Sequence, residues 1–178
     1  MRLPKLSLES IRGWVFEKKL TRAKKIKSLI IFTVGFLAGI YIPSKITITL
    51  TDSVKHRIFW MTDVPSIAEI KKGNYLLFNK DHPWKEKYRG ITKMIKEVGC
   101  VGGDTLTKQG TEFFCNGVSM GSALPTDSTG NPLPQFLFTG IIPNGKIFVR
   151  GHHFRSFDSK YYGFITEQDV VAKATPLF

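Results

Sequence analysis

The chain has 178 residues, enough for one domain with a sizeable core and short additional segments. Its 42% hydrophobic and 22% charged content is that of a folded protein and excludes a disordered or low-complexity chain. The net charge of +12 is uneven, because residues 1–27 carry nine Lys or Arg against two Glu, whereas the other 151 residues carry only +5. Since the excess charge lies in a short head, the composition disfavours a nucleic-acid-binding domain.

An uncharged run of 15 residues, Ser28 to Ile42, separates this basic head from Pro43. Counted from Ile26, with Lys27 reaching the lipid headgroups, the run has 17 residues and is just long enough to span a bilayer. The basic cluster before it predicts that the N-terminus is cytoplasmic. We therefore expect a basic cytoplasmic head over 1–25, a transmembrane anchor over 26–43 and an extracytoplasmic domain over 44–178. A cleaved signal peptide and a buried core helix remain as alternatives.

From Ile46 onward the pattern is typical of β-structure. Ile46, Ile48 and Leu50 alternate with threonines, which gives the period of two expected for a strand. Glycine- and asparagine-containing turns separate the further segments, and Ser122–Gln135 has the composition of a loop. No helical periodicity follows the apolar run, so we predict a mainly β, barrel-like domain of coiled antiparallel sheets. The further predicted strands are Ile58–Met61, Tyr75–Asn79, Thr92–Val98, Thr105–Gln109, Glu112–Cys115, Lys146–Arg150 and Asp169–Ala174.

A row of hydroxyl side chains continues the first strand pattern. Thr47, Thr49, Thr51 and Ser53 share one face if the strand continues, with the aliphatic side chains behind them. A serine at a strand end can act as a nucleophile where a base lies within reach, and the Thr51 hydroxyl could donate to an oxyanion. Taken alone, alternating threonines are also ordinary strand composition.

Lys96 lies in an otherwise apolar strand, between Met94 and Val98 on the same face. Removing an ammonium group from water lowers its pKa, and a lysine that is neutral near pH 7 is a general base. Reaching a pKa of roughly 7 needs about 4–5 kcal/mol of destabilisation of the charged form, which burial can supply. A lysine that extends its amine to solvent at a strand edge is the alternative.

Cys100 and Cys115 would both lie in the outer compartment, where oxidising conditions permit a disulfide. The turn at Gly102-Gly103-Asp104 between them is compatible with neighbouring strands of a hairpin. Two separate small buried side chains fit the pattern equally well, so the sequence leaves the bond open.

Three blocks carry a family resemblance. Residues 96–104 (KEVGCVGGD) match Lys-Arg-Val-x-x-x-Pro-Gly-Asp, and residues 151–163 (GHHFRSFDSKYYG) match a box that ends Ser-x-Asp-Ser-Arg-Tyr-x-Gly. The stretch Thr51-Asp52-Ser53, followed by Ile58-Phe59-Trp60, looks like a nucleophile block. From Ile46 to Phe178 the chain resembles the type I signal peptidases, which are membrane-anchored serine–lysine endopeptidases. Within that family it looks most like the conjugative-transfer peptidases of the TraF type, which mature pilin subunits.

The resemblance implies a role for each matching residue. Ser53 would attack the scissile carbonyl and Lys96 would take its proton, while the Ser53 N–H and the Thr51 hydroxyl would hold the oxyanion. Ser156 would orient the Lys96 amine, and Asp158, Ser159 and Lys160 would brace the site. The chain departs from the family at Val54-Lys55-His56, where the family has Met or Leu and then Pro, and also at Glu97, Gly102 and Lys160. Ser44, in Ile42-Pro43-Ser44, is an alternative nucleophile that lacks the following strand pattern.

No cofactor or metal is expected. His152 and His153 would point to opposite faces of a strand, which suits neither a catalytic triad nor a paired metal site. The resemblance implies a single-pass protein of the cytoplasmic (inner) membrane, with a periplasmic or other extracytoplasmic catalytic domain. Its expected partners are the membrane, a precursor protein such as a conjugative pilin, and other conjugation or secretion components, but no nucleic acid. The alternatives are a general signal peptidase that removes leader peptides and a non-catalytic envelope component.

Overall fold

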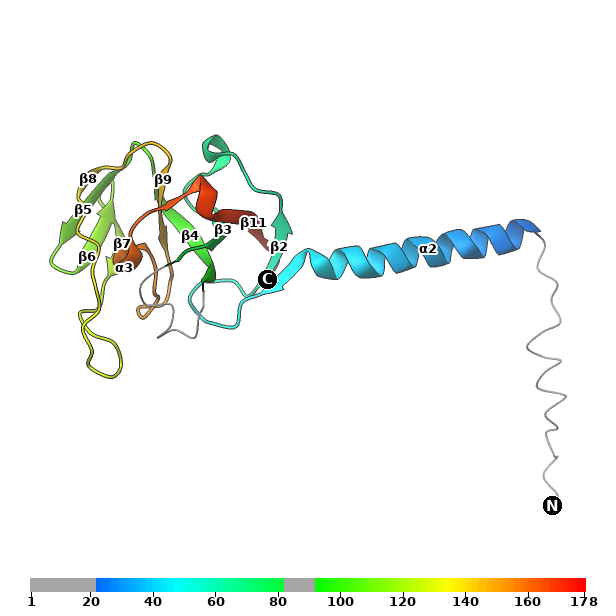
Figure 1. Cartoon of the computed structure of the whole chain (residues 1–178), viewed down its shortest axis with the longest axis horizontal. Coiled ribbons are helices and arrows are strands. Elements are labelled where there is room, and N and C mark those ends of the chain that lie inside the picture. Colours follow the sequence, from blue (N-terminus) through cyan, green and yellow to red (C-terminus); the bar gives the residue numbers. More distant parts are fainter. Residues whose placement is uncertain (1–21, 82–91) are drawn as a thin grey trace, which may run out of the picture. The chain divides into compact units, whose positions relative to one another are not determined.

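The computed structural model describes residues 22–81 and 92–178, so most of the predicted head over 1–25 lies outside the described residues. The chain divides into two compact units, Met1–Ser44 and Lys45–Phe178. The described part of the first unit is a single helix, and the second unit is built almost entirely from antiparallel strands (Figure 1). The predictions of a mainly β domain and of one N-terminal apolar helix are therefore confirmed.

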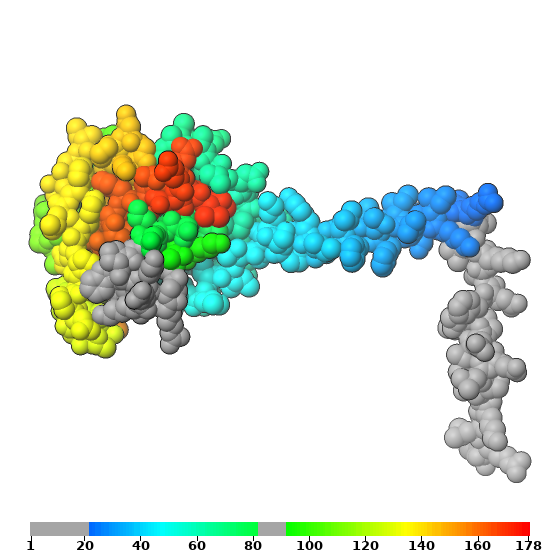
Figure 2. Space-filling model, viewed as in Figure 1, coloured from blue at the N-terminus to red at the C-terminus, as the bar shows by residue number. Residues whose placement is uncertain are grey.

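Helix α2 (Arg22–Ser44) contains the whole of the predicted anchor over 26–43. It has 23 residues and a mean hydropathy of 1.8, which by length and composition is enough to cross a membrane. None of its side chains is buried against any described residue, and its large apolar side chains from Ile26 to Ile42 are exposed. Figure 2 shows the helix as a rod of exposed side chains. A core helix would bury one face, so this alternative has no support in the described structure.

The larger sheet has seven strands in the order β1-β2-β11-β3-β4-β9-β10, and every neighbouring pair is antiparallel. The long central strand β4 pairs with β3 on one side and with β9 on the other. A register shift between Val98 and Cys100 marks a β-bulge on the β9 side. The strands are β1 (Ile46–Ile48), β2 (Ile58–Thr62), β3 (Tyr75–Asn79), β4 (Lys93–Val101), β9 (Lys146–Arg150), β10 (Ile165–Thr166) and β11 (Val170–Pro176).

The smaller sheet has four strands in the order β7-β6-β5-β8. Its labelled strands β5, β6 and β8 lie to the left of β3, β4 and β11 in Figure 1. The strands are β5 (Thr105–Gln109), β6 (Glu112–Cys115), β7 (Val118–Ser122) and β8 (Gly140–Ile141). A disulfide between Cys100 in β4 and Cys115 in β6 joins this sheet to the larger one, with Cα atoms 5.9 Å apart. Both cysteines are buried, so the bond lies inside the core.

Three clusters of buried side chains form the core. One lies against the smaller sheet and includes Phe113, Phe148 and the disulfide cysteines. The second lies on the Leu76 and Val98 face of the larger sheet, and the third, around Phe59 and Tyr75, includes Val54 from the β1–β2 connection. Apolar packing therefore fixes β4, whose residues contribute to all three clusters.

The first strand is shorter than its threonine pattern predicts, and this corrects the expectation for Ser53. β1 ends at Ile48, and Ser53 lies in a turn between β1 and β2 rather than at a strand end. Leu50 is 92% exposed, so no aliphatic side chain supports the hydroxyl row from behind. Beyond the pair Ile48–Ile58, the last backbone contact between the two segments is the hydrogen bond from Thr49 N–H to Arg57 O at 2.9 Å, which closes the loop that holds Ser53.

The other predicted strands are confirmed, with ends that differ by no more than a few residues. The sequence analysis missed the strands β7, β8 and β10, as well as the one-turn helix α3 (Ser159–Tyr162) and the 3₁₀ turns Ile67–Glu69 and Glu167–Asp169. Two of these strands have only two residues, too few to show a period of two. Likewise, His152 and His153 lie in a bend beyond the end of β9, not on a strand as expected.

The disulfide should contribute measurably to stability. Cys115→Ser removes a cross-link that closes a loop with a sequence separation of 15 residues. The chain-entropy relation then predicts a loss of about 3 kcal/mol in the free energy of unfolding. Denaturant titration of the two proteins measures this loss, and mass spectrometry without reductant verifies the bond in the wild type. A variant as stable as the wild type would show that the cross-link makes no net contribution to the free energy of unfolding.

Candidate active site

Strand β4 holds Lys96 in the interior of the domain. Its side chain is on the face shared by Met94 and Val98, and its backbone pairs with Leu76 of β3. The residue is only 4% exposed, and its Nζ donates a hydrogen bond to Ser156 Oγ at 2.7 Å. Burial lowers the pKa of the Lys96 amine to about 8, with nearby Asp158 acting to raise the pKa and Lys160 to lower it. The amine is therefore a proton acceptor in the neutral to mildly alkaline range.

Gly151 lies where three site segments meet. Glu97 pairs with Arg150 across the β4–β9 ladder, so Gly151, the residue after the end of β9, lies beside Lys96. A Cβ added at Gly151 would collide with Ser156 Oγ and would approach Ser53 O to 2.7 Å. Only a residue without a side chain lets these segments come so close. The absence of a side chain at residue 151 therefore lets the Ser53 carbonyl and the Ser156 side chain both approach the backbone beside Lys96.

Ser53 is held in its turn by a backbone hydrogen bond, because His152 N–H donates to Ser53 O at 2.8 Å. The next residue, Val54, is buried in the core, and Arg57 pairs with Asp52 across the turn. The Ser53 hydroxyl lies 3.0 Å from the Thr51 hydroxyl. Among the described residues no hydrogen bond joins Ser53 Oγ directly to Lys96 Nζ. The hydroxyl would have to turn from Thr51 toward the amine to transfer its proton.

A buried ion pair organises the segment after Gly151. Asp158 is fully buried and caps the N-terminus of α3. Its carboxylate accepts hydrogen bonds from Gly151 N at 2.8 Å, from Lys160 N at 3.1 Å and from Lys160 Nζ at 2.6 Å. Ser159 Oγ accepts from Val149 N at 2.9 Å, which fastens α3 to β9. These contacts fix the loop that carries Ser156, since Ser156 N also donates to His153 O at 2.8 Å.

The opposite face of β4 carries a second polar cluster, which the sequence analysis did not identify. Glu97 accepts hydrogen bonds from Arg150 Nη2 at 2.9 Å and Nε at 3.3 Å, from Tyr75 OH at 3.4 Å, and it contacts His152 Nε2. Burial acts to raise the pKa of Glu97, but Arg150 and His152 outweigh it, so the pKa is below its usual value. The sequence feature that could have pointed to this cluster is the position of Glu97 directly after Lys96 in an otherwise apolar strand.

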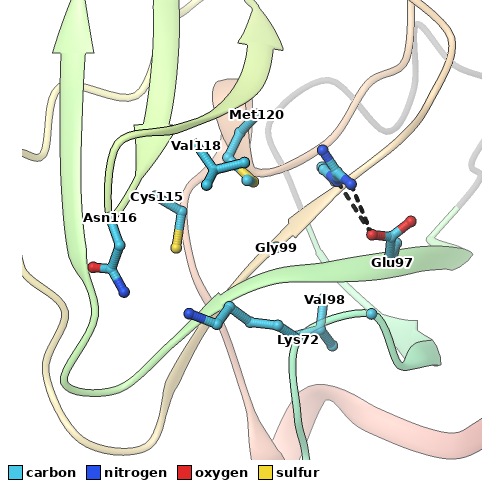
Figure 3. A pocket seen from close by; sticks show the side chains of 10 residues that line it. Lys72, Glu97, Val98, Gly99, Cys115, Asn116, Val118 and Met120 are labelled. Atoms are coloured by element: carbon cyan, nitrogen blue, oxygen red, sulfur yellow. Dashed lines mark hydrogen bonds and ion pairs between the residues drawn. The ribbon is translucent and has the colours of Figure 1, made fainter.

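A pocket of about 230 Å³ adjoins this cluster. Figure 3 shows Glu97, Val98 and Gly99 along one strand, facing Cys115, Asn116, Val118 and Met120. Lys72, which also lines the pocket, pairs with Asp104 at 3.0 Å. Lys96 is not among the residues that line this pocket.

The described residues contain one group with metal-ligand chemistry, formed by Cys100, Asp104 and Cys115. Both sulfur atoms are already joined in the disulfide, and Asp104 accepts hydrogen bonds from Val101 N and Asn116 Nδ2. No histidine belongs to such a group among these residues. Ser44, the alternative nucleophile, lies in the last turn of α2, where its hydroxyl donates to Tyr41 O at 2.7 Å.

Residues 22–178 match the family described as signal peptidase, peptidase S26. Among solved structures, the chain is similar to a signal peptidase I from Enterococcus faecalis V583. The two sequences are 23% identical, with a TM-score of 0.38, and the match covers 61% of this chain and 98% of that one. A search of curated proteins found no match.

The lowered pKa of Lys96 makes the stability of the fold depend on pH. The folded pKa of about 8 is below the ordinary value of 10.5, so between these values the unfolded chain binds more protons. Stability should therefore rise as the pH rises through this window. Compared with Lys96→Met, the wild type should gain about 2 kcal/mol in the free energy of unfolding between pH 7.5 and pH 10. Denaturant titrations of both proteins at the two pH values measure the difference, and parallel curves would contradict a buried amine.

Gly151→Ala should disrupt the site itself. The added methyl collides with Ser156 Oγ and with the Ser53 carbonyl, so we expect a loss of about 1–3 kcal/mol in the free energy of unfolding. We also expect the hydrogen bond between His152 N–H and Ser53 O to be lost, seen as faster amide exchange at His152. Gly39→Ala in α2 is the control, since its backbone is helical and an added Cβ would meet no other atom within 4 Å. A tolerated Gly151→Ala would mean that the three segments are not closely packed.

Proposed function

Because the chain belongs to the signal peptidase, peptidase S26, family, we propose that it is a membrane-anchored endopeptidase with a Ser53–Lys96 dyad. The family implies a serine protease that acts on precursor proteins at a membrane. The observation that most supports Lys96 as the base is its buried amine of lowered pKa, hydrogen-bonded to Ser156 Oγ. The convergence of Ser53 and Ser156 at Gly151 supports Ser53 as the nucleophile.

In the proposed reaction, Ser53 Oγ attacks the scissile carbonyl carbon and transfers its proton to the neutral Lys96 amine. The Ser53 N–H and the Thr51 hydroxyl stabilise the oxyanion. The C–N bond then breaks, the leaving amine takes the proton from Lys96, and an ester joins the substrate to Ser53. Water attacks this ester in simple hydrolysis, whereas an amine of the same substrate would give a cyclic product.

The remaining residues of the last box would support the dyad without contacting the substrate. Ser156 orients the Lys96 amine by accepting its hydrogen bond, which leaves the nitrogen lone pair free to face Ser53. Asp158 and Lys160 form a buried pair that holds the loop in place, and Ser159 fastens α3 to β9. No cofactor or metal enters this mechanism.

We further propose that α2 is a retained single-pass anchor in the cytoplasmic membrane, with the N-terminus inside and residues 44–178 outside. Its substrate would then be a membrane-inserted or exported precursor with small residues at the cleavage point, as the family implies. The resemblance to TraF-type peptidases favours a conjugative pilin, with or without cyclisation, over a general leader peptide. Other conjugation or secretion components are the expected partners. A non-catalytic envelope role is the alternative that the substitutions after Ser53 favour.

The proposal is tested by co-expression of the full chain with candidate precursors. Ser53→Ala and Lys96→Ala should each abolish processing while the protein stays folded and membrane-bound, and the double variant should be no worse than either single one. In the wild type, kcat/KM should rise with pH through a pKa of about 8, as Lys96 loses its proton.

Ser44→Ala is the control, because Ser44 belongs to the helical unit. Full activity in Ser53→Ala with loss in Ser44→Ala would move the nucleophile to the membrane exit. Processing that both Ser53→Ala and Lys96→Ala retain would favour the non-catalytic role.

A further inference from the structure

Two adjacent residues of β4, Lys96 and Glu97, lie on opposite faces of the strand. Lys96 faces the site, whereas the side chain of Glu97 lies on the opposite face of the strand and is 12% exposed. Figure 3 shows Glu97 at the end of the pocket-lining part of β4. Its carboxylate forms an ion pair with Arg150 at 2.9 Å. The same carboxylate contacts His152 Nε2 and accepts from Tyr75 OH. These three partners come from β9 (Arg150), from β3 (Tyr75) and from the segment after Gly151 (His152).

His152 connects Glu97 to Ser53. Its side chain contacts the Glu97 carboxylate, and its backbone N–H donates to Ser53 O at 2.8 Å. A residue fixed at its ring and at its main chain has little freedom to move, so the position of Ser53 O follows that of the His152 ring. The carboxylate is buried and paired with Arg150, so it holds the His152 ring in a fixed position.

A second connection passes through Tyr75. Its ring packs edge-on against His56 with centroids 5.7 Å apart, and against Phe59 at 5.3 Å. His56 belongs to the same turn as Ser53, and Val54 between them is buried against this aromatic group. The Tyr75 hydroxyl in turn donates to Glu97. The turn is therefore contacted at Ser53 by His152 and at His56 by Tyr75, and both of these residues contact Glu97.

We propose that Glu97 is a positioning residue, which holds the turn of Ser53 over Lys96 through His152 and Tyr75. The inference rests on the proposed role of Ser53 as nucleophile and goes beyond it. A single strand then supplies the base from one face and fixes the nucleophile from the other. The pair of adjacent residues, Lys96 and Glu97, sets the relative position of the two reacting groups.

The test compares Glu97→Gln, His152→Ala and their double variant with the wild type. Glu97→Gln keeps the size of the side chain but removes the charge that binds Arg150 and His152. His152→Ala removes the ring but keeps the backbone N–H that binds Ser53. Glu69→Gln is the matched control, because Glu69 also accepts hydrogen bonds, from Ser66, but lies in the exposed turn Ile67–Glu69. Leu106→Ala, a buried change in the smaller sheet, controls for a general loss of stability.

Each variant is measured in two ways, by precursor cleavage per folded molecule and by amide hydrogen exchange. We expect kcat to fall about 10-fold in Glu97→Gln and in His152→Ala with KM nearly unchanged, which corresponds to about 1.4 kcal/mol in the barrier. The amides of His152 and of the Ser53 turn should exchange faster in both. The double variant should be no slower in cleavage than the worse single one, since both substitutions break the same connection. Glu69→Gln and Leu106→Ala should leave kcat per folded molecule and His152 exchange unchanged.

The two proposals fail in different ways. If Ser53→Ala is inactive but Glu97→Gln keeps the wild-type kcat, or keeps the wild-type exchange at His152, only the positioning role is overturned. An equal fall in kcat for Leu106→Ala would also overturn it, since general destabilisation would then explain the effect. If Ser53→Ala remains active, the proposed function fails and the positioning role falls with it, whatever the exchange data show.

Discussion

The site depends on one buried carboxylate, that of Asp158. It is fully buried and has three hydrogen-bond donors, two of which, a main-chain N–H and an ammonium group, belong to Lys160 and the third to Gly151. Removing a charge from water is costly, and such a pair rarely adds net stability over apolar packing. Its effect is on geometry. By fixing Gly151, Asp158 determines where Ser53 O and Ser156 Oγ lie, and through Ser156 it orients the amine of Lys96.

The same carboxylate limits how far the pKa of Lys96 falls. Burial favours the neutral amine, whereas the negative charge of Asp158 favours the ammonium form and the positive charge of Lys160 opposes it. If Asp158 had no cation beside it, its attraction would hold the proton on Lys96 more strongly. Asp158 can therefore hold the loop through its hydrogen bonds, while the positive charge of Lys160 opposes its effect on the pKa of Lys96. The resulting pKa of about 8 suits a base that gains its proton in one step and loses it in the next.

The departures from the family blocks have physical explanations in this fold. Lys160 replaces an arginine that could bind a carboxylate with two donors, but the backbone N–H of Lys160 provides a second donor to Asp158. Glu97 replaces the arginine after the lysine, and a guanidinium is supplied instead by Arg150 of the neighbouring strand. At residues 54–56, Val54 is buried and His56 packs on Tyr75, so this turn is held by core contacts and not by a proline. The substitutions at Glu97 and His56 are thus matched by partners that are distant in sequence, Arg150 and Tyr75.

The sequence by itself determined the features that depend on local pattern. Alternating side chains located most strands and the apolar run located α2, because each signal lies within a few consecutive residues. The apolar neighbours of Lys96 predicted a buried amine only together with the family resemblance. The blocks of residues 96–104 and 151–163 also pointed to the family.

Only the tertiary structure decided that the Ser53 turn leaves the sheet after Ile48, that Cys100 and Cys115 join two sheets, and that Gly151 brings three segments together. It also revealed Glu97, His152 and Tyr75 as one cluster. Most of these features arise from contacts between residues that are distant in sequence, and no local periodicity records which distant side chain will fill a given space.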